Sequence, residues 1–174
     1  MGSDRLSRMF GAAACVVVLA ATGSACAPPA PPPQDVAADE AKLKADAGIW
    51  FEHIRNGNAD AAANLYAEDA VVLPDKAPAL HGRAEVRDYF AGMIAEIKAA
   101  GLTFKDNGPN GAGVSGDMGW ISGTYTVVDA SGQTVDTGKY LSVHHRTNGT
   151  WLYIRDIWNS DLAPPAAADA GKGK

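Results

Sequence analysis

GWISGTYTVVDASGQTVDTGKYLSVHHRTNGTWLYIRDIW, residues 119–158, is the stretch that decides the fold. It is rich in Thr, Tyr, Val, Ile and Trp, the residue types that favour β-strands. Two turn signals interrupt it, DASG at residues 129–132 and TNG at residues 147–149. The spacing therefore predicts antiparallel hairpins, and LTFKD at residues 102–106 adds a strand before them.

The chain before residue 101 follows a helical period instead. Apolar side chains recur at helical spacing in residues 36–57 and 83–100, so each range predicts a helix. Asn58 is placed to cap a short second helix that ends near Glu68, and residues 70–73 predict a short strand. Helices followed by a meander predict an α+β domain in which the helices pack on one face of the sheet.

The N-terminal 25 residues have the features of a signal peptide. Arg5 and Arg8 precede an apolar run that is too short to span a membrane comfortably and suits a secretory segment. GSAC, residues 23–26, resembles the lipobox of bacterial lipoproteins, which implies cleavage before Cys26 and lipid on its thiol. Ordinary signal-peptidase cleavage remains the alternative. Either way we expect a periplasmic or cell-surface protein.

The segments that flank the domain have no apolar periodicity. Residues 26–35 are rich in Pro and predict a semi-rigid tether. Residues 163–174 predict a disordered tail, which leaves residues 36–162 as the folded domain. That domain contains no cysteine, so it has neither disulfides nor a Cys-ligated zinc site.

Charge and motif content exclude further classes of function. The formal net charge is -5 and no basic patch stands out, so nucleic acid is not an expected partner. There is no Gly-rich phosphate loop, and the histidine spacing indicates no metal site. We therefore predict neither a cofactor nor a metal ion.

The order of these elements resembles the nuclear transport factor 2-like cone fold and, within it, the SnoaL-like and ketosteroid-isomerase-like proteins. The likeness is carried by RNGNADAAANLYAEDAVVLP, HGRAEVRDYF, GDMGWISGTYT with GKYLSV, and NGTWLYIRDIWNSD. It is closest to a bacterial subgroup of unassigned function. The resemblance implies a curved antiparallel sheet wrapped around three N-terminal helices, an apolar cavity inside, and a homodimer through the outer sheet face.

The isomerase chemistry of that family does not carry over to this sequence. Those enzymes use an Asp base together with a Tyr and a protonated Asp that stabilise the enolate. An ungapped alignment places these three positions at Pro74, Trp50 and Val143. Pro and Val move no proton and Trp only donates an N–H, so steroid isomerisation is not expected. Whether the protein is an enzyme at all stays open.

Strand alternation then sorts the candidate ligand-binding residues. If Val143 faces the cavity, Lys139 and His145 share its face, whereas Tyr140 and His144 point away. The same register points residues of the neighbouring strands and helices inward. The expected ligand-binding set is Trp50, Tyr66, Phe90, Trp120, Thr124, Lys139, Val143, Ile154 and Trp158. Such a cavity is aromatic and mostly apolar, as small-molecule sites usually are.

The same register also points Asp156 inward, and it is the most informative residue, because an unpaired acid on an inner strand face is costly to bury. It is either a functional carboxyl with a raised pKa or a structural partner of Lys139, His145 or a pocket aromatic. His145 is either a titrating group or a hydrogen-bonded core histidine. Asp156 and His145 are thus the candidate catalytic pair.

Three functions follow from this pattern. The first is an exported, lipid-anchored domain that binds a small, mostly apolar molecule. The second is a SnoaL- or isomerase-like enzyme, an isomerase, cyclase or hydrolase, that uses Asp156 and His145. The third is a domain that docks a partner through an open sheet face carrying Tyr125 and Tyr140. The sequence names neither the ligand nor the partner.

Overall fold

The computed structural model describes residues 34–162. The predicted signal peptide, Cys26, most of the predicted tether and the predicted tail lie outside these residues.

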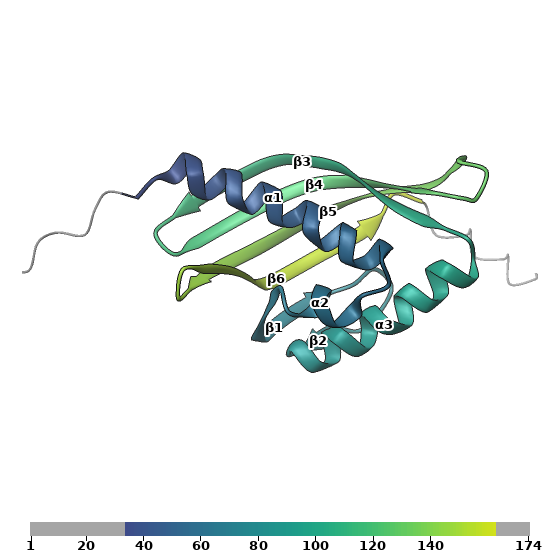
Figure 1. Cartoon of the computed structure of the whole chain (residues 1–174), viewed down its shortest axis with the longest axis horizontal. Helices are drawn as coiled ribbons and strands as arrows, with labels where there is room; N and C mark the ends of the chain where they lie inside the picture. Colours follow the sequence, from purple (N-terminus) through teal and green to yellow (C-terminus); the bar gives the residue numbers. More distant parts are fainter. Residues whose placement is uncertain (1–33, 163–174) are drawn as a thin grey trace, which may run out of the picture. The chain divides into compact units, whose positions relative to one another are not determined.

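Three helices form in the predicted regions, although the second is shorter than predicted. They are α1 (Val36–Arg55), α2 (Ala59–Ala63) and α3 (Arg83–Ala99) (Figure 1). The side chains of Asp35 and Asn58 accept hydrogen bonds from backbone N–H groups of the first turns of α1 and α2, which satisfies donors that a helix leaves unpaired. Within residues 34–162, no helix has the length and apolar content of a membrane span.

Six strands form one sheet in the order β2-β1-β6-β5-β4-β3. Their bounds are β1 (Tyr66–Leu73), β2 (Leu80–His81), β3 (Thr103–Ser115), β4 (Met118–Val128), β5 (Thr134–Thr147) and β6 (Thr150–Ser160). β3 to β6 are an antiparallel meander, and the turns at residues 129–132 and 147–149 lie where the sequence predicts them. The predicted α+β architecture is confirmed.

Two expectations about β1 are wrong. The second helix does not continue to Glu68, because β1 begins at Tyr66 and Glu68 and Asp69 lie within the strand. Pairing of β1 with the buried β6 outweighs the helix-forming character of the local sequence. The sheet is also not wholly antiparallel, since β1 runs parallel to β6.

β3 is longer than the predicted five residues. It continues through an Asn- and Gly-rich segment to Ser115, with register irregularities on both sides of Pro109. Pro109 is tolerated because β3 is an edge strand of the sheet, where one side of the backbone needs no partner.

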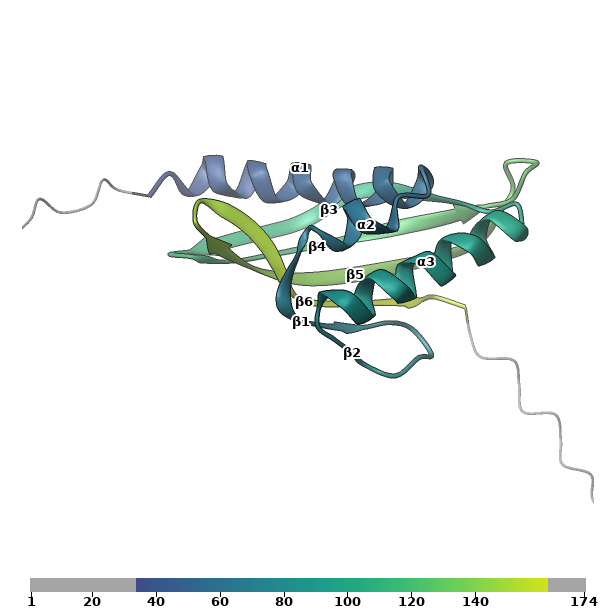
Figure 2. The same ribbon diagram turned by 60° about the horizontal axis from the view of Figure 1, so that its bottom comes forward.

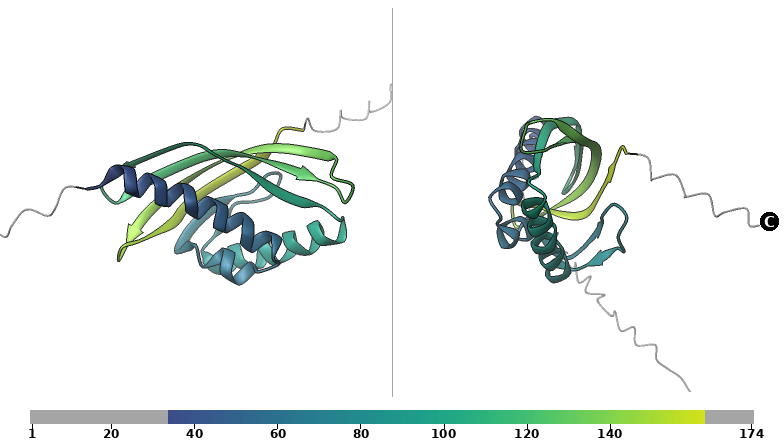
Figure 3. Two further views of the ribbon diagram at one scale, coloured as in Figure 1. Left: turned by 45° about the horizontal axis from the view of Figure 1, so that its top comes forward. Right: turned by 90° about the vertical axis from the view of Figure 1, so that its right-hand side faces the viewer.

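The helices cover one face of the curved sheet (Figures 2 and 3). α1 lies along β3 and β4, whereas α2 and α3 pack together near β1. The core between the helices and the sheet includes Leu43 and Ile54 of α1, Phe90 of α3 and Ile121 of β4. The concave sheet face is therefore the inner one, and no helix within residues 34–162 covers the opposite face (Figure 3).

Candidate functional site

The inner face of β5 is opposite to the predicted one. Tyr140, Ser142 and His144 lie on the side of the helices, with Ser142 and His144 fully buried. Lys139 and His145 are exposed on the outer face, and Val143 lies there with them. Alternation separates the two faces of a strand but does not say which is buried, and a register error of one residue exchanges them.

β4 repeats the inversion. Ile121, Tyr125 and Val127 are buried inside, while Thr124 lies on the outer face and Trp120 is 43% exposed. Trp120 and Thr124 are thus not cavity residues.

A β-bulge changes the alternation in β6. Val143 of β5 pairs with Arg155, but the next residue, His144, pairs with Tyr153. Ile154 is therefore an extra residue, so Tyr153 on one side of it and Asp156 on the other both face inward. The predicted inward positions of Asp156 and Trp158 are confirmed, and that of Ile154 is wrong.

An aromatic cavity lies between the helices and this inner face. Its lining residues are Ala47, Trp50 and Phe51 of α1, Met93 of α3, Phe104 of β3, Tyr125 of β4, Tyr140 of β5, and Tyr153, Asp156 and Trp158 of β6. Its volume is about 40 Å³, which accommodates only a few water molecules. Most of the space inside the sheet is filled by the protein's own rings.

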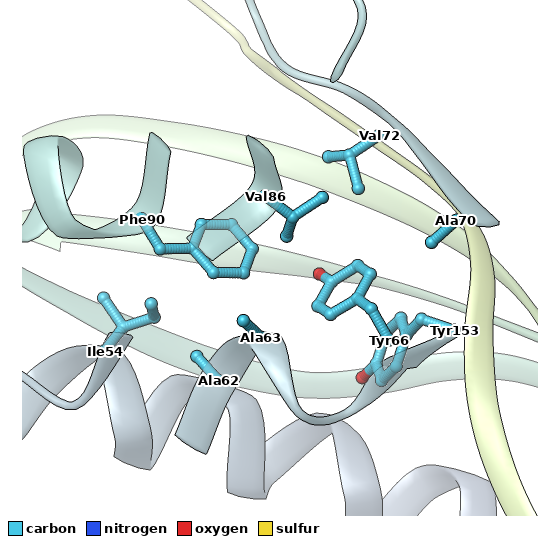
Figure 4. Packing of buried hydrophobic residues seen from close by; sticks show 9 residues of the cluster. All are labelled: Ile54, Ala62, Ala63, Tyr66, Ala70, Val72, Val86, Phe90 and Tyr153. Carbon is cyan, nitrogen blue, oxygen red and sulfur yellow. The ribbon is translucent and has the colours of Figure 1, made fainter. Parts of the chain in front are cut away.

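Tyr66 and Phe90 lie beside this cavity rather than in its wall. Both side chains are fully buried in the core cluster shown in Figure 4. The Tyr66 ring stacks on Tyr153 with centroids 4.8 Å apart and meets Phe90 edge-on at 5.5 Å. This packing holds the Tyr66 hydroxyl in one place.

Asp156 is the one acid in the cavity wall. The Tyr66 hydroxyl donates a hydrogen bond of 2.6 Å to Oδ2 of Asp156. Burial raises the pKa of Asp156 to about 7, although the Tyr66 hydrogen bond acts in the opposite direction. Lys139 and His145, the partners proposed from sequence, lie on the far face of the sheet, whereas the alternative aromatic partner is present as Tyr66.

Two further polar groups of the cavity wall have no hydrogen-bond partner among the described residues. They are the indole N–H of Trp50 and the hydroxyl of Tyr140. Burial raises the pKa of Tyr140, and the negative charge of Asp106 adds to this effect. A buried donor without a partner costs free energy, so both groups are available to a ligand.

His144, which sequence reasoning placed on the outside, is a buried inner residue. Its Nε2 lies 3.0 Å from Oγ of Ser142, while Nδ1 has no partner among residues 34–162. Burial lowers the pKa of His144 to about 4, so the ring is neutral at physiological pH. The only signal in the sequence was its place in an alternating strand, which fits either face.

Within residues 34–162, no group of His, Cys, Asp and Glu side chains is arranged to hold a metal ion.

The sequence profile of the SnoaL-like domain matches residues 49–154, which is more than half of the chain. The chain belongs to the SnoaL-like domain family. No curated protein matches this sequence.

Solved structures show the same fold. A nuclear transport factor 2-like protein with a cystatin-like fold from Novosphingobium aromaticivorans has a TM-score of 0.63 and 16% identity, covering 70% of this chain and 82% of its own. A provisionally assigned dehydratase of the same superfamily from Streptomyces avermitilis has a TM-score of 0.60 and 18% identity, over 73% and 99% of the two chains. A provisionally assigned aromatic ring hydroxylase from Novosphingobium aromaticivorans has a TM-score of 0.61 and 18% identity, over 75% and 94%.

Proposed function

We propose that this SnoaL-like domain binds a small, mostly apolar molecule in the aromatic cavity and that Asp156 anchors the polar group of that molecule. The observation that carries the proposal is the placement of Asp156. Its carboxyl is buried among aromatic rings, one oxygen accepts a hydrogen bond from Tyr66, and none of the described residues that line the cavity is cationic. A buried carboxyl of this kind, in the same cavity wall as the unpartnered N–H of Trp50, lowers the stability of the fold, so stability does not explain its presence.

The small free volume adds a requirement. A cavity of about 40 Å³ does not hold a ring system, so side chains must move when a ligand enters. Met93 is the most adaptable of the lining residues because its side chain is unbranched and flexible.

The test is binding of N-phenyl-1-naphthylamine, a neutral aromatic amine that fluoresces in apolar surroundings. Trp158→Ala should weaken its binding by about tenfold, because the variant loses a large aromatic ring of the cavity wall. Trp120→Ala is the matched control on the outer face and should have little effect. Asp156→Asn should weaken binding while the exposed Asp69→Asn does not. Equal effects of the two tryptophan variants would remove the cavity from the proposal.

A second candidate function is enzymatic, and the pKa of Asp156 favours it. With a pKa of about 7, both protonation states of Asp156 are populated at neutral pH, which a general acid or base requires. His145 is not part of this site, so Asp156 would act with Tyr66 and Trp50. Provisional assignments of fold neighbours as a dehydratase and a hydroxylase are compatible with such chemistry.

Steroid isomerisation is still not expected from this site. Trp50 lines the cavity, but Val143 lies on the outer sheet face and Pro74 has no proton to transfer. The wild-type protein should therefore convert a β,γ-unsaturated ketosteroid no faster than buffer does. Conversion above that background would contradict either the alignment of these three positions or the mechanism assumed for them.

We further propose that the protein is exported and held at a membrane by lipid on Cys26, which lies outside the described residues. The support is GSAC before a Pro-rich segment. Cys26→Ser should move the protein from the membrane fraction to the soluble fraction. A wild-type protein that is soluble and carries an unmodified Cys26 would contradict the anchor.

A further inference from the structure

A second hollow opens at the ends of α1 and α3, and we call it the outer groove. It is lined by Ile54, Arg55, Asn56 and Gly57 after the last turn of α1, by Ile94, Ile97 and Lys98 of α3, and by Leu102, Thr103 and Phe104 at the start of β3. Its volume is about 480 Å³, compared with about 40 Å³ for the aromatic cavity. The outer groove therefore adjoins the aromatic cavity and, unlike it, has room for part of a ligand without rearrangement.

The outer groove and the aromatic cavity are consecutive along the same elements. On α1, Trp50 and Phe51 line the cavity and Ile54 lines the groove, one helical turn further on. On α3, Met93 lines the cavity and its neighbour Ile94 lines the groove. Phe104 lines both hollows, so its ring is the wall between them.

The groove joins an apolar floor to two cations. Ile54, Ile97 and Leu102 supply apolar surface, while Arg55 and Lys98 are exposed at its rim. No acidic side chain lines the groove, and neither cation forms a salt bridge within residues 34–162. The C-terminal ends of α1 and α3 favour cations, but a helix end carries only about half an elementary charge. Positive charge thus remains for a ligand.

Charge also sets the direction in which a ligand lies. An anion pushed into the aromatic cavity would meet Asp156 and would lose its hydration without gaining a cation. The same anion at the rim of the outer groove lies beside Arg55 and Lys98 and stays in contact with water. The apolar part of an amphipathic molecule is the part that the cavity accepts.

We propose that the outer groove is the outer half of the ligand site and takes the anionic end of an amphipathic molecule, whose apolar part passes Phe104 into the aromatic cavity. The inference rests on the proposed function, because it uses the same cavity. To the mostly apolar molecule with a polar group at Asp156, it adds one carboxylate, sulfonate or similar anionic end that lies in the outer groove.

Two probes that differ by one anionic group test this proposal. 8-Anilinonaphthalene-1-sulfonate has the ring system of N-phenyl-1-naphthylamine plus a sulfonate. The wild-type protein should bind the sulfonate about fivefold to tenfold more tightly than the Arg55→Ala/Lys98→Ala variant does at low salt, as expected for two exposed charge contacts. The neutral probe should bind both proteins equally, and added salt should remove the preference. Lys44→Ala, an exposed cation earlier on α1, should bind both probes as the wild type does.

The role of Phe104 has its own readout. Phe104→Ala removes the shared wall and should speed the association of both probes severalfold in stopped-flow fluorescence. Unchanged association rates would overturn the route past Phe104.

The outcomes separate this inference from the proposed function. If Trp158→Ala weakens the neutral probe but loss of Arg55 and Lys98 leaves sulfonate binding unchanged, the anion site is wrong and the cavity stands. If Trp158→Ala affects neither probe, the proposed function and this inference both fail. Loss of sulfonate binding in Trp120→Ala alone would place the probe on the outer sheet face and would also overturn the inference.

Discussion

Asp156 lies where a carboxylate is least favourable, and its surroundings explain how the fold tolerates it. The residue is only 7% exposed, and aromatic rings form most of the cavity wall around it. The Tyr66 hydroxyl at 2.6 Å satisfies one oxygen in either protonation state of the acid. Because its pKa is about 7, the carboxyl is present at neutral pH in both its protonated and its ionised form. The cavity thus contains a group that can accept or donate a hydrogen bond.

The raised pKa of Asp156 makes a prediction for stability. The pKa of Asp156 is 3.8 in the unfolded chain and about 7 in the folded protein. Between these two pH values the unfolded chain binds fewer protons than the folded protein does, so the contribution of Asp156 to stability is lost as the pH rises. The loss is roughly 4 kcal/mol at most. Asp156→Asn does not titrate, so its melting temperature should rise relative to the wild type between pH 4 and pH 8.

Comparing the variant with the wild type at each pH cancels the titration of His144, which has the opposite sign. The lowered pKa of His144 costs stability as the pH falls from 6.5 towards about 4. Asp69→Asn is the exposed control. If the difference in melting temperature between Asp156→Asn and the wild type stays constant from pH 4 to pH 8, the raised pKa of a buried Asp156 is contradicted.

The sequence identified Asp156, Trp50 and Trp158 as inner residues but not Tyr125, Tyr140 or His144. Asp156 and Trp158 were found by strand alternation along the last strand, and Trp50 because it shares the apolar face of α1. Both faces of β4 and β5 carry apolar residues, for example Trp120 outside and Ile121 inside. Alternation in such strands gives two equivalent answers, and only packing against the helices selects one.

At the scale of elements, glycines in the strands make room for inward rings. A Cβ atom at Gly138 of β5 would lie 2.1 Å from Cζ of Tyr125, and one at Gly123 of β4 would lie 2.3 Å from the hydroxyl of Tyr140. Each tyrosine thus lies across the bare backbone of the neighbouring strand. This arrangement lets two large rings lie flat against the sheet and line the cavity.

Gly138→Ala should displace Tyr125 and destabilise the domain by about 1–3 kcal/mol, because the Tyr125 ring also packs against Phe104 and has little space to move. Thermal unfolding should show a melting temperature lower by several degrees, and the affinity for N-phenyl-1-naphthylamine should change. Gly92→Ala on α3 is the control, since a Cβ there meets nothing within 4 Å. Gly92→Ala should stabilise α3 by up to about 1 kcal/mol. A Gly138→Ala protein as stable as the wild type would show that Tyr125 does not depend on this contact.

Other features of the elements were not readable from local sequence. The pairing of β5 and β6 changes register at Ile154, which forms the bulge, and no glycine or proline in the sequence marks this position. β1 was predicted from residue 70 although it begins at Tyr66, because its first residue is defined by pairing with Tyr153 of β6. Long-range pairing of this kind leaves no periodic signal in a short segment.

At the scale of the whole molecule, the outer sheet face carries an apolar patch and no helix in the described chain. Its exposed side chains include Trp120, Leu141, Ile157 and Leu73, each more than 40% exposed. Leu141 pairs with Ile157, and Ile157 pairs with Leu73, so three of these lie in one row across β5, β6 and β1. An apolar patch of this kind is typical of an interaction surface, and we propose that a second copy of the chain covers it.

Leu141→Asp should prevent that association, because a charge in the centre of an apolar interface is costly to desolvate. Light scattering at micromolar concentration should show a dimer for the wild type and a monomer for the variant. Ile49→Asp places the same charge on α1, away from the outer sheet face, and should remain dimeric. A strictly monomeric wild type would contradict the dimer.

The central claim is that the inner sheet face holds a functional carboxyl in an apolar cavity. The most direct test is a carbon-13 NMR titration of the side-chain carboxyl groups of Asp in the folded domain, with Asp156→Asn used to assign the Asp156 signal. We predict one carboxyl that titrates at about pH 7 and is absent from the variant. A spectrum in which Asp156 titrates near its ordinary pKa of 3.8 would contradict the claim.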